Sequence, residues 1–292
     1  MFGRPEHAAV NATLNATLDR VGTLIVAHRG CGVGSLVQNT ALGVKAALLS
    51  GADMVEIDVS ASRDGRFFCF HDGTEPELLG VQANLQTMSA FEIDQHSYVW
   101  RDRPGRDVKV EGLGTVLKQF RGQDALFTVD RSWWRWPALL TLLDGLKMTP
   151  QLLIKCPAWE SVSLDLLRAH PVKYPFLPIC GTPEEAHELL DDSQLNVPGV
   201  EVITTTRDSP WFDPAVIADL HARGAFVFVN TMTLTTGIHL FGGLDDETAV
   251  RVSPEAAWGP IFDLGVDAIQ TDWPWVLRDF RTAHARPRAR LG

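Results

Sequence analysis

The sequence lacks the features that mark membrane, secreted and nucleic-acid-binding proteins. Its 292 residues include only four cysteines, which are far apart and form no C-x-x-C pair, so we expect reduced and mostly buried thiols. No apolar run reaches the length of a transmembrane helix, which is about 18 residues or more, and the N-terminal segment has no apolar core of the signal-peptide type. We therefore predict a cytoplasmic protein without stable membrane insertion.

Positive charge is also scarce. The formal net charge is −10, with 26 Lys and Arg residues against 36 Asp and Glu residues. Broad binding of nucleic acid needs a basic face, so we expect no nucleic-acid partner. This charge balance still permits a local cationic pocket for one phosphate group.

The sequence does contain a regular alternation of strand-like and helix-like segments. Helix-like segments at 41–51, 136–147, 161–170, 182–192 and 213–224 follow most of the apolar runs. The runs are continuously apolar, as in a parallel sheet covered by helices. They predict an α/β fold, a (β/α)8 TIM barrel in one domain over 1–292, with a doubly wound open sheet as the alternative. The eight apolar runs span residues 23–28, 52–59, 125–130, 151–155, 176–180, 199–205, 225–230 and 266–272.

Two segments lie outside this alternation. Residues 1–22 read as a polar N-terminal helix or extension. Residues 72–112 are long for a connection between a strand and a helix. They contain a short helix candidate after Thr87 and a charged stretch at 101–109. We predict that 72–112 form a small insertion after the second strand, over the C-terminal face of the barrel.

Charged and polar residues gather where the predicted strands end. Barrel enzymes place their sites at the C-terminal ends of the strands, and a packed core disfavours such groups. If the barrel closes, these side chains converge. The residues concerned are His28, Arg29, Glu56, Asp58, His71, Asp72, Asp130, Arg131, Lys155, Glu201, Asn230, Thr271 and Asp272.

Glu56 and Asp58 form a candidate metal site. They are two residues apart on a strand, so their side chains share one face and repel each other unless a positive charge lies between them. One Mg²⁺ or Ca²⁺ ion would fit, because these cations take oxygen ligands, and Asp130 could supply a third carboxylate. The alternative is that these carboxylates cap turns or pair with Arg29 or Lys155.

Two histidines and two cations accompany the acids. His28 and His71 follow different strands, which suggests a paired acid and base. Arg29 and Lys155 would bind an anionic oxygen, and the guanidinium of Arg29 also suits an ion pair with a neighbouring carboxylate. Together these residues indicate metal-assisted hydrolysis of a phosphate ester.

Several short motifs resemble the signature of glycerophosphodiester phosphodiesterases. They are AHRG (27–30), QNT (38–40), VEIDVSASRDG (55–65), FHD (70–72) and GVDAIQTDWPWVL (265–277). The resemblance implies a TIM barrel with an insertion after the second strand. It also implies a divalent cation on Glu56, Asp58 and a third acid, His28 and His71 as the acid–base pair, and Arg29 on the phosphate. We carry the third metal position to Asp130 and the family's lysine to Lys155.

One position departs from the family pattern. Where the family has Glu-Asn-Thr, this chain has Gln38, which keeps hydrogen bonding and drops the charge. Gln38, Asn230 and Trp273 are further candidates for substrate binding. The expected partner is a small phosphodiester, and a glycerophosphodiester would yield an alcohol and sn-glycerol 3-phosphate.

Two other functions stay open at the level of sequence. The first is a phospholipase D-like enzyme that acts on a lysophospholipid or a sugar phosphodiester, with a substrate hydroxyl as the attacking group and a cyclic phosphate as the first product. The second is an inactive barrel that binds a phosphorylated ligand. The sequence leaves the oligomeric state undecided.

Overall fold

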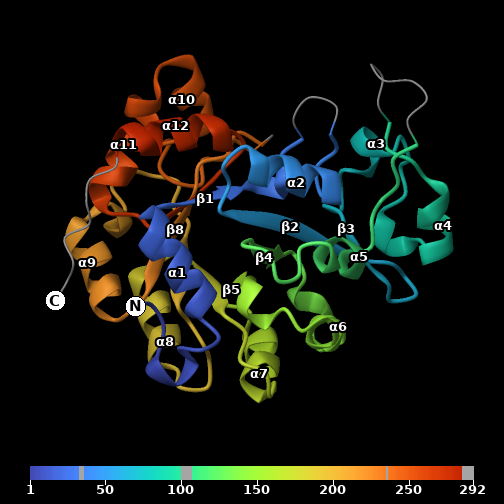
Figure 1. Ribbon diagram of the computed structural model, residues 1–292, viewed down its shortest axis with the longest axis horizontal. Helices are drawn as coiled ribbons and strands as arrows, with labels where there is room; N and C mark the ends of the chain where they lie inside the picture. Colours follow the sequence, from blue (N-terminus) through green and yellow to red (C-terminus); the bar gives the residue numbers. More distant parts are fainter. Residues whose placement is uncertain (33–35, 100–106, 235, 285–292) are drawn as a thin grey trace.

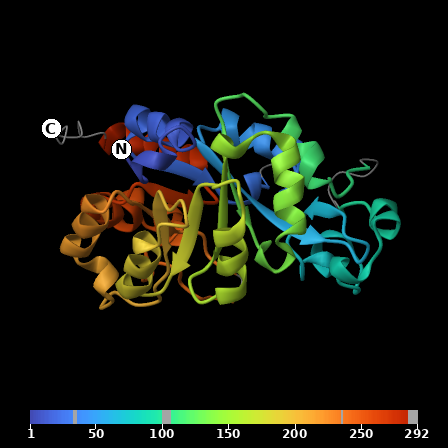
Figure 2. The same cartoon turned by 90° about the horizontal axis from the view of Figure 1, so that it is seen from below.

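Eight parallel strands form a closed barrel. The computed structural model describes residues 1–32, 36–99, 107–234 and 236–284. The strands follow the order β1-β9-β8-β7-β6-β5-β4-β2, and β1 also pairs with β2, which closes the sheet (Figures 1 and 2). This closure excludes the open sheet and confirms the predicted TIM barrel. The barrel strands are β1 (Leu24–Ala27), β2 (Met54–Ala61), β4 (Leu126–Asp130), β5 (Leu152–Pro157), β6 (Phe176–Cys180), β7 (Gly199–Val202), β8 (Phe226–Asn230) and β9 (Ala268–Thr271).

Helices cover the outside of the barrel. Several begin with a side-chain cap; Thr182, for example, accepts a hydrogen bond from Glu185 N, and Pro183 occupies the first helical turn, as its sequence predicts. Within the described residues no helix is both long and apolar enough to cross a membrane. The main helices are α1 (Ala12–Val21), α2 (Ala41–Leu49), α5 (Leu113–Lys118), α6 (Ala138–Leu146), α7 (Ser161–Ala169), α8 (Pro183–Asp191), α9 (Pro214–Ala222), α10 (Asp246–Arg251), α11 (Pro254–Leu264) and α12 (Pro274–His284).

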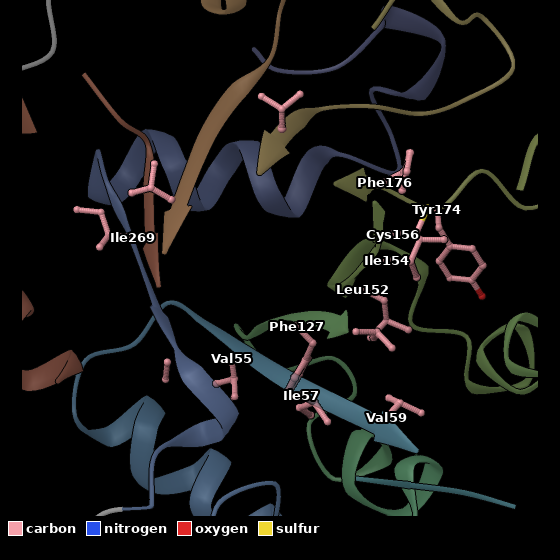
Figure 3. Close-up of a cluster of buried hydrophobic side chains, with 14 of the residues drawn as sticks. Val55, Ile57, Val59, Phe127, Leu152, Ile154, Cys156, Tyr174, Phe176 and Ile269 are labelled. Atoms are coloured by element: carbon pink, nitrogen blue, oxygen red, sulfur yellow. The ribbon is translucent and has the colours of Figure 1, made fainter. Parts of the chain in front are cut away.

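Successive side chains along each strand point to opposite faces of the barrel, which gives one apolar layer outside it and one inside it. On β2, Val55, Ile57 and Val59 point outward into the core between strands and helices, where Figure 3 shows them beside residues of β4 and β5. Met54 points inward and packs with residues such as Leu14 of α1, which covers the N-terminal end of the barrel. Glu56 and Asp58 share the inward face with Met54, so the fold directs both carboxylates to the barrel axis.

An additional strand, which is not among the eight predicted apolar runs, directly precedes the predicted insertion. Strand β3 (Phe67–Cys69) pairs antiparallel with the end of β2. Helices α3 (Glu75–Leu78) and α4 (Ala90–Gln95) follow and lie beside β2 and β3 (Figure 1). Helix α4 corresponds to the short helix predicted after Thr87. A separate apolar cluster that includes Phe68, Phe70 and Leu85 holds this segment together. Part of the charged stretch predicted at 101–109 lies outside the described residues.

All four cysteines are buried free thiols, as expected.

Short 3-10 turns complete the secondary structure. The turn that matters most for the site is η2 (His28–Gly30), directly after β1. The other 3-10 turns are η1 (Pro5–His7), η3 (Leu85–Thr87), η4 (Trp133–Arg135), η5 (Thr149–Gln151) and η6 (Pro210–Phe212).

Candidate active site at the barrel mouth

A cavity of about 180 Å³ lies at the C-terminal ends of the barrel strands. It brings together eight of the ten residues that the sequence nominates for the site. Apolar side chains, among them Trp133, Met232 and Leu240, form another part of its wall. The eight nominated residues in its lining are His28, Arg29, Glu56, Asp58, His71, Asp130, Lys155 and Asn230.

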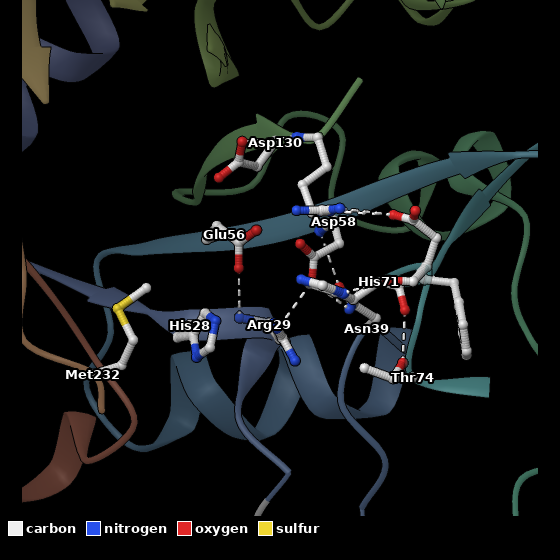
Figure 4. Close-up of polar contacts among 12 residues, drawn as sticks. His28, Arg29, Asn39, Glu56, Asp58, His71, Thr74, Asp130 and Met232 are labelled. Carbon is white, nitrogen blue, oxygen red and sulfur yellow. Dashed lines mark hydrogen bonds and ion pairs between the residues drawn. The ribbon is translucent and has the colours of Figure 1, made fainter. Parts of the chain in front are cut away.

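Arg29 connects β1 with the two acids of β2. Its backbone N donates a hydrogen bond of 2.8 Å to Glu56 Oε2, and its Nε lies 3.0 Å from Asp58 Oδ2 (Figure 4). Arg29 has a φ of 55°, a left-handed conformation that is costly for a residue with a side chain. This turn lets the backbone contact one carboxylate while the guanidinium contacts the other.

Asn39 holds Asp58 from the opposite direction. Its Nδ2 donates to Asp58 Oδ2 at 3.0 Å, and its Oδ1 accepts from the backbone N of Asp58 at 3.1 Å. Asn39 also has a positive φ, 56°, which asparagine tolerates better than most residues do. Asn39 lies in the QNT motif, but its role is not visible in the sequence, because only the fold brings Asn39 against Asp58.

Lys155 is enclosed by carboxylates. Its side chain is 1% exposed, and its Nζ lies 2.7 Å from both Asp130 Oδ2 and Glu201 Oε2. Asn230 Nδ2 donates to the other oxygen of Glu201 at 2.7 Å. Burial alone would lower the pKa of Lys155, but the two carboxylates outweigh it and raise the pKa well above its usual value. The lysine is therefore charged, and it links three strands through ion pairs.

The cavity contains more negative than positive charge. Burial, followed by repulsion from Asp58, raises the pKa of Glu56 to about 8. The lining carries four carboxylates and three cationic side chains, Arg29, Arg131 and Lys155. Because Arg131 is paired with Asp72 outside the lining, negative charge is in excess when all of these groups are ionised. The carboxylates in the lining are Glu56, Asp58, Asp130 and Glu201.

This donor set fits a divalent cation in charge and chemistry. Glu56 Oε1 and Asp58 Oδ1 accept no hydrogen bond from any described residue, so each keeps lone pairs for a ligand. The described residues do not include a group of three or more His, Cys, Asp and Glu side chains gathered as closely as metal ligands. Cation binding would therefore require these side chains to move closer together.

The two histidines are held differently. His28 Nδ1 lies 2.8 Å from Asp272 Oδ1, whereas His71 Nδ1 lies 2.8 Å from the backbone O of Asp72. Burial alone would lower the pKa of His28, but the hydrogen bond and charge of Asp272 raise it above its usual value. Burial, assisted by Arg29, lowers the pKa of His71. In each ring the hydrogen-bonded Nδ1 leaves Nε2 available for a ligand.

Asp272 and Arg131 have roles that the sequence analysis did not assign. Asp272 was noted only as a strand end, yet it is the partner of His28. Arg131, with a φ of 53°, turns back from β4, and its guanidinium contacts Asp72 Oδ1 at 3.0 Å, beside His71. Their position directly after predicted strands is the signal that could have identified both.

Gln38 and Trp273 do not belong to the lining of this cavity. Gln38 is half-buried, next to Asn39. Trp273 is 36% exposed and lines a neighbouring cavity of about 290 Å³ with residues that include Asp246 and Asp272. Asp272 thus lines this second cavity and contacts His28, which lines the first. A substrate contact of Gln38 or Trp273 stays a prediction.

Comparison with known sequences gives limited matches. Residues 176–280 match the family DUF4996, which is described as a domain of unknown function. The uncharacterized protein YqiK of Bacillus subtilis is 28% identical over 109 residues, which cover 37% of this chain and 44% of YqiK. This match thus spans less than half of the curated relative.

Comparison with solved structures covers nearly the whole chain. A glycerophosphoryl diester phosphodiesterase from Parabacteroides distasonis superposes with a TM-score of 0.70 at 18% identity, covering 91% of this chain and 88% of the other. A glycerophosphodiester phosphodiesterase from Agrobacterium tumefaciens gives 0.63 at 22% identity, with coverages of 89% and 99%. An Oleispira antarctica phosphodiesterase in complex with the product sn-glycerol-3-phosphate gives 0.62 at 20% identity, with coverages of 89% and 96%. The chain therefore has the barrel fold found in glycerophosphodiester phosphodiesterases.

Proposed function

We propose that this protein hydrolyses a phosphodiester, and that the substrate is a glycerophosphodiester cleaved to an alcohol and sn-glycerol 3-phosphate. The observation that carries the proposal is the lining of one cavity by His28, His71 and Arg29 together with the paired acids Glu56 and Asp58. These groups can move protons and bind phosphate oxygens, which is the chemistry of ester hydrolysis. The sn-glycerol-3-phosphate bound as product by the Oleispira phosphodiesterase supports the glycerol half of the substrate.

Glu56 and Asp58, with Asp130, would hold one Ca²⁺ or Mg²⁺ ion. The excess of negative charge in the lining and the open oxygens of Glu56 and Asp58 support this assignment. Such a cation supplies Lewis-acid stabilisation of the charge on the reacting phosphate. Asp130 would keep its ion pair with Lys155 through Oδ2.

Arg29 would bind a phosphate oxygen. Its Nε is occupied by Asp58, but a guanidinium carries five N–H donors, so its terminal nitrogens stay available. Lys155 lines the same cavity and would add its positive charge while it stays paired with Asp130 and Glu201. Asn230 would act indirectly, because its amide nitrogen donates to Glu201 and so holds that carboxylate in place.

His28 would act as the general acid and His71 as the general base. The carboxylate of Asp272 favours the imidazolium form of His28, so its Nε2–H can be given to the leaving alcohol. For His71, burial together with Arg29 and Arg131 outweighs the charge of Asp58 and the backbone carbonyl of Asp72, so its lowered pKa favours the neutral ring. Its free Nε2 can take the proton of the attacking water. Two similar groups with pKa values pushed in opposite directions are typical of an acid–base pair.

The test is a panel of glycerophosphodiesters, lysophospholipids and sugar phosphodiesters, assayed with Mg²⁺ or Ca²⁺ and followed by ³¹P NMR. We expect sn-glycerol 3-phosphate as the phosphorus product. A cyclic phosphate would instead indicate attack by a substrate hydroxyl, and release of choline from a lysophospholipid would indicate the phospholipase D-like reaction.

Variants connect this activity to the site. His28→Ala and His71→Ala should each lower kcat by about 10²- to 10⁴-fold. His187→Ala is the matched control, because His187 lies on α8 and contacts Asp219 outside the cavity. Wild-type turnover in both active-site variants, or no turnover of any diester by the wild-type protein, would refute the proposal.

A further inference from the structure

A buried carboxylate that the proposed reaction does not use lies behind His28. Asp246 is the first residue of α10 and is 2% exposed. Its Oδ1 accepts a hydrogen bond from Thr231 Oγ1 at 2.7 Å. Its Oδ2 accepts from Thr271 Oγ1 at 2.9 Å and from the backbone N of Asp272 at 2.8 Å. Asp246 forms no ion pair with any described residue, so these three donors replace the water that its carboxylate loses on burial.

These bonds tie together the ends of two barrel strands. Thr231 directly follows β8, and Thr271 is the last residue of β9. The backbone N of Asp246 also donates to Thr231 O at 2.7 Å, and Thr231 N donates to Gln270 O at 2.9 Å. Asp246 therefore fixes the turn at Thr271 and Asp272 from both strands.

The same turn carries the partner of His28. The side chain of Asp272 is 45% exposed, and within the described residues His28 is its one polar partner. Side-chain contacts of Asp272 thus do little to fix its direction. The backbone of Asp272 sets that direction, and Asp246 Oδ2 holds the backbone N of Asp272.

We propose that Asp246 is a positioning residue for His28, and that it acts by holding the backbone of Asp272 so that the Asp272 carboxylate meets His28 Nδ1. This inference rests on the proposed function, in which His28 donates a proton. Asp246 touches neither the cavity that would hold the substrate nor His28 itself. Groups that orient another reacting side chain in this way commonly change activity by about 10- to 100-fold when they are removed.

The hydrogen bonds, rather than the charge, carry this role, and a conservative variant separates the two. In Asp246→Asn, the amide oxygen can still accept from Thr271 and from Asp272 N. The amide nitrogen can donate to Thr231 Oγ1, because that hydroxyl can turn its single proton from residue 246 to Gln270 O, which lies 2.9 Å away. We expect Asp246→Asn to keep kcat within about threefold of wild type. Asp246→Ala should lower kcat about tenfold or more with little change in KM.

A double-mutant cycle tests whether the effect passes through Asp272. Asp272→Ala alone should lower kcat by about 10²-fold, within the range for impaired acid–base catalysis. Adding Asp246→Ala to Asp272→Ala should lower kcat by no more than about twofold further, because the carboxylate that Asp246 positions is already gone. If the two losses multiply, Asp246 acts independently of Asp272 and the inference is wrong.

The matched control is Asp267→Ala. Asp267 is a buried carboxylate at the opposite end of β9, where it contacts His221. Its removal should lower stability without lowering kcat per folded molecule. If Asp246→Ala does not fold, Thr271→Val removes one of the same hydrogen bonds and should lower kcat at least about threefold. Wild-type kcat in folded Asp246→Ala, or in Thr271→Val where Asp246→Ala does not fold, would overturn the inference.

A spectroscopic reading separates this inference from the proposed function. In protein with ¹⁵N-labelled histidine, the Nδ1 signal of His28 should report the hydrogen bond to Asp272. We expect this signal to shift in Asp246→Ala and to stay in place in Asp246→Asn and Asp267→Ala. An unchanged signal in Asp246→Ala contradicts the inference even if the enzyme is active. A shifted signal in a protein that hydrolyses no diester supports the positioning and refutes only the function.

Discussion

Replacing Lys155 by methionine tests how the buried ion pairs stabilise the barrel. Methionine keeps the length and the apolar contacts of the side chain, including those near the ring of Phe228, which lies 5.5 Å from Lys155 Nζ. It removes the one charge that contacts both Asp130 and Glu201 at 2.7 Å. Two carboxylates with side chains only 18% and 4% exposed then lose their shared partner.

The expected loss of stability follows from this geometry. Removing one member of a buried ion pair costs about 3–5 kcal/mol, because the remaining charge is left without a partner. A domain of this size loses roughly 2–4 °C of Tm per kcal/mol, so Lys155→Met should melt at least about 6 °C below wild type. Lys118→Met, on the exposed side of α5, should stay within about 0.5 kcal/mol.

The loss should also depend on pH in a defined direction. Burial already raises the pKa of Glu201, and without Lys155 this pKa should rise further, whereas the pKa of Asp130, which Lys155 holds below its usual value against burial, should rise above that value. A raised acid pKa destabilises the fold above that pKa, and the cost shrinks as pH falls toward the unfolded value. We expect the loss to be smaller at pH 5 than at pH 8 by about 1 kcal/mol or more.

Urea unfolding and calorimetry at both pH values, with EDTA present, measure this effect. EDTA removes cations that could take the place of the lysine charge. The double variant Lys155→Met/Glu201→Gln should recover part of the lost stability, because it removes one of the two unpaired charges. A loss below about 1 kcal/mol at pH 8, or a larger loss at pH 5 than at pH 8, would show that the ion pairs do not work as reasoned.

Three further predictions concern the reaction. The value of kcat/KM should fall at low pH, as the base His71 becomes protonated below its lowered pKa. It should also fall at high pH, as the acid His28 loses its proton above its raised pKa. The residual activity of His28→Ala should lose the alkaline limb, and persistence of that limb would assign it to another group. EDTA should abolish turnover and Ca²⁺ or Mg²⁺ should restore it; calorimetric titration should show tighter cation binding as pH rises toward 8, because Glu56 has a pKa of about 8 and protons compete with the cation. Asn39→Ala should lower kcat/KM about 10- to 100-fold, because Asp58 loses two hydrogen bonds, and steady-state kinetics with unchanged activity would remove Asn39 from the site.

The barrel strands could be predicted because both faces of a parallel barrel strand are buried. Residues 225–230, for example, read as an unbroken apolar run, and β8 occupies Phe226–Asn230. Strand β3 was not among the predicted strands, since three residues that form a hairpin with β2 are too few to show a period of their own. Helix α10 was missed for a similar reason: its short, largely polar sequence carries no apolar stripe.

The candidate site was predictable where a residue lies on a strand or directly after one. His28, Asp130 and Lys155 could be located in this way, because the barrel gathers strand ends at one mouth. Asn39 and Asp246 come from loops and a short helix, and their bonds to Asp58 and Asp272 depend on the three-dimensional path of the chain. Gln38 stands out as a departure from a motif, but the neighbouring Asn39 is the residue whose side chain reaches Asp58.

The contact between His28 and Asp272 joins residues 244 positions apart, at the seam where β1 meets β9. During synthesis, His28 is made early, and its partner Asp272 is made only 244 residues later. A chain that stops before Asp272 therefore lacks the carboxylate that contacts His28 Nδ1. In the proposed reaction, full activity should therefore begin only after β9 has paired with β1.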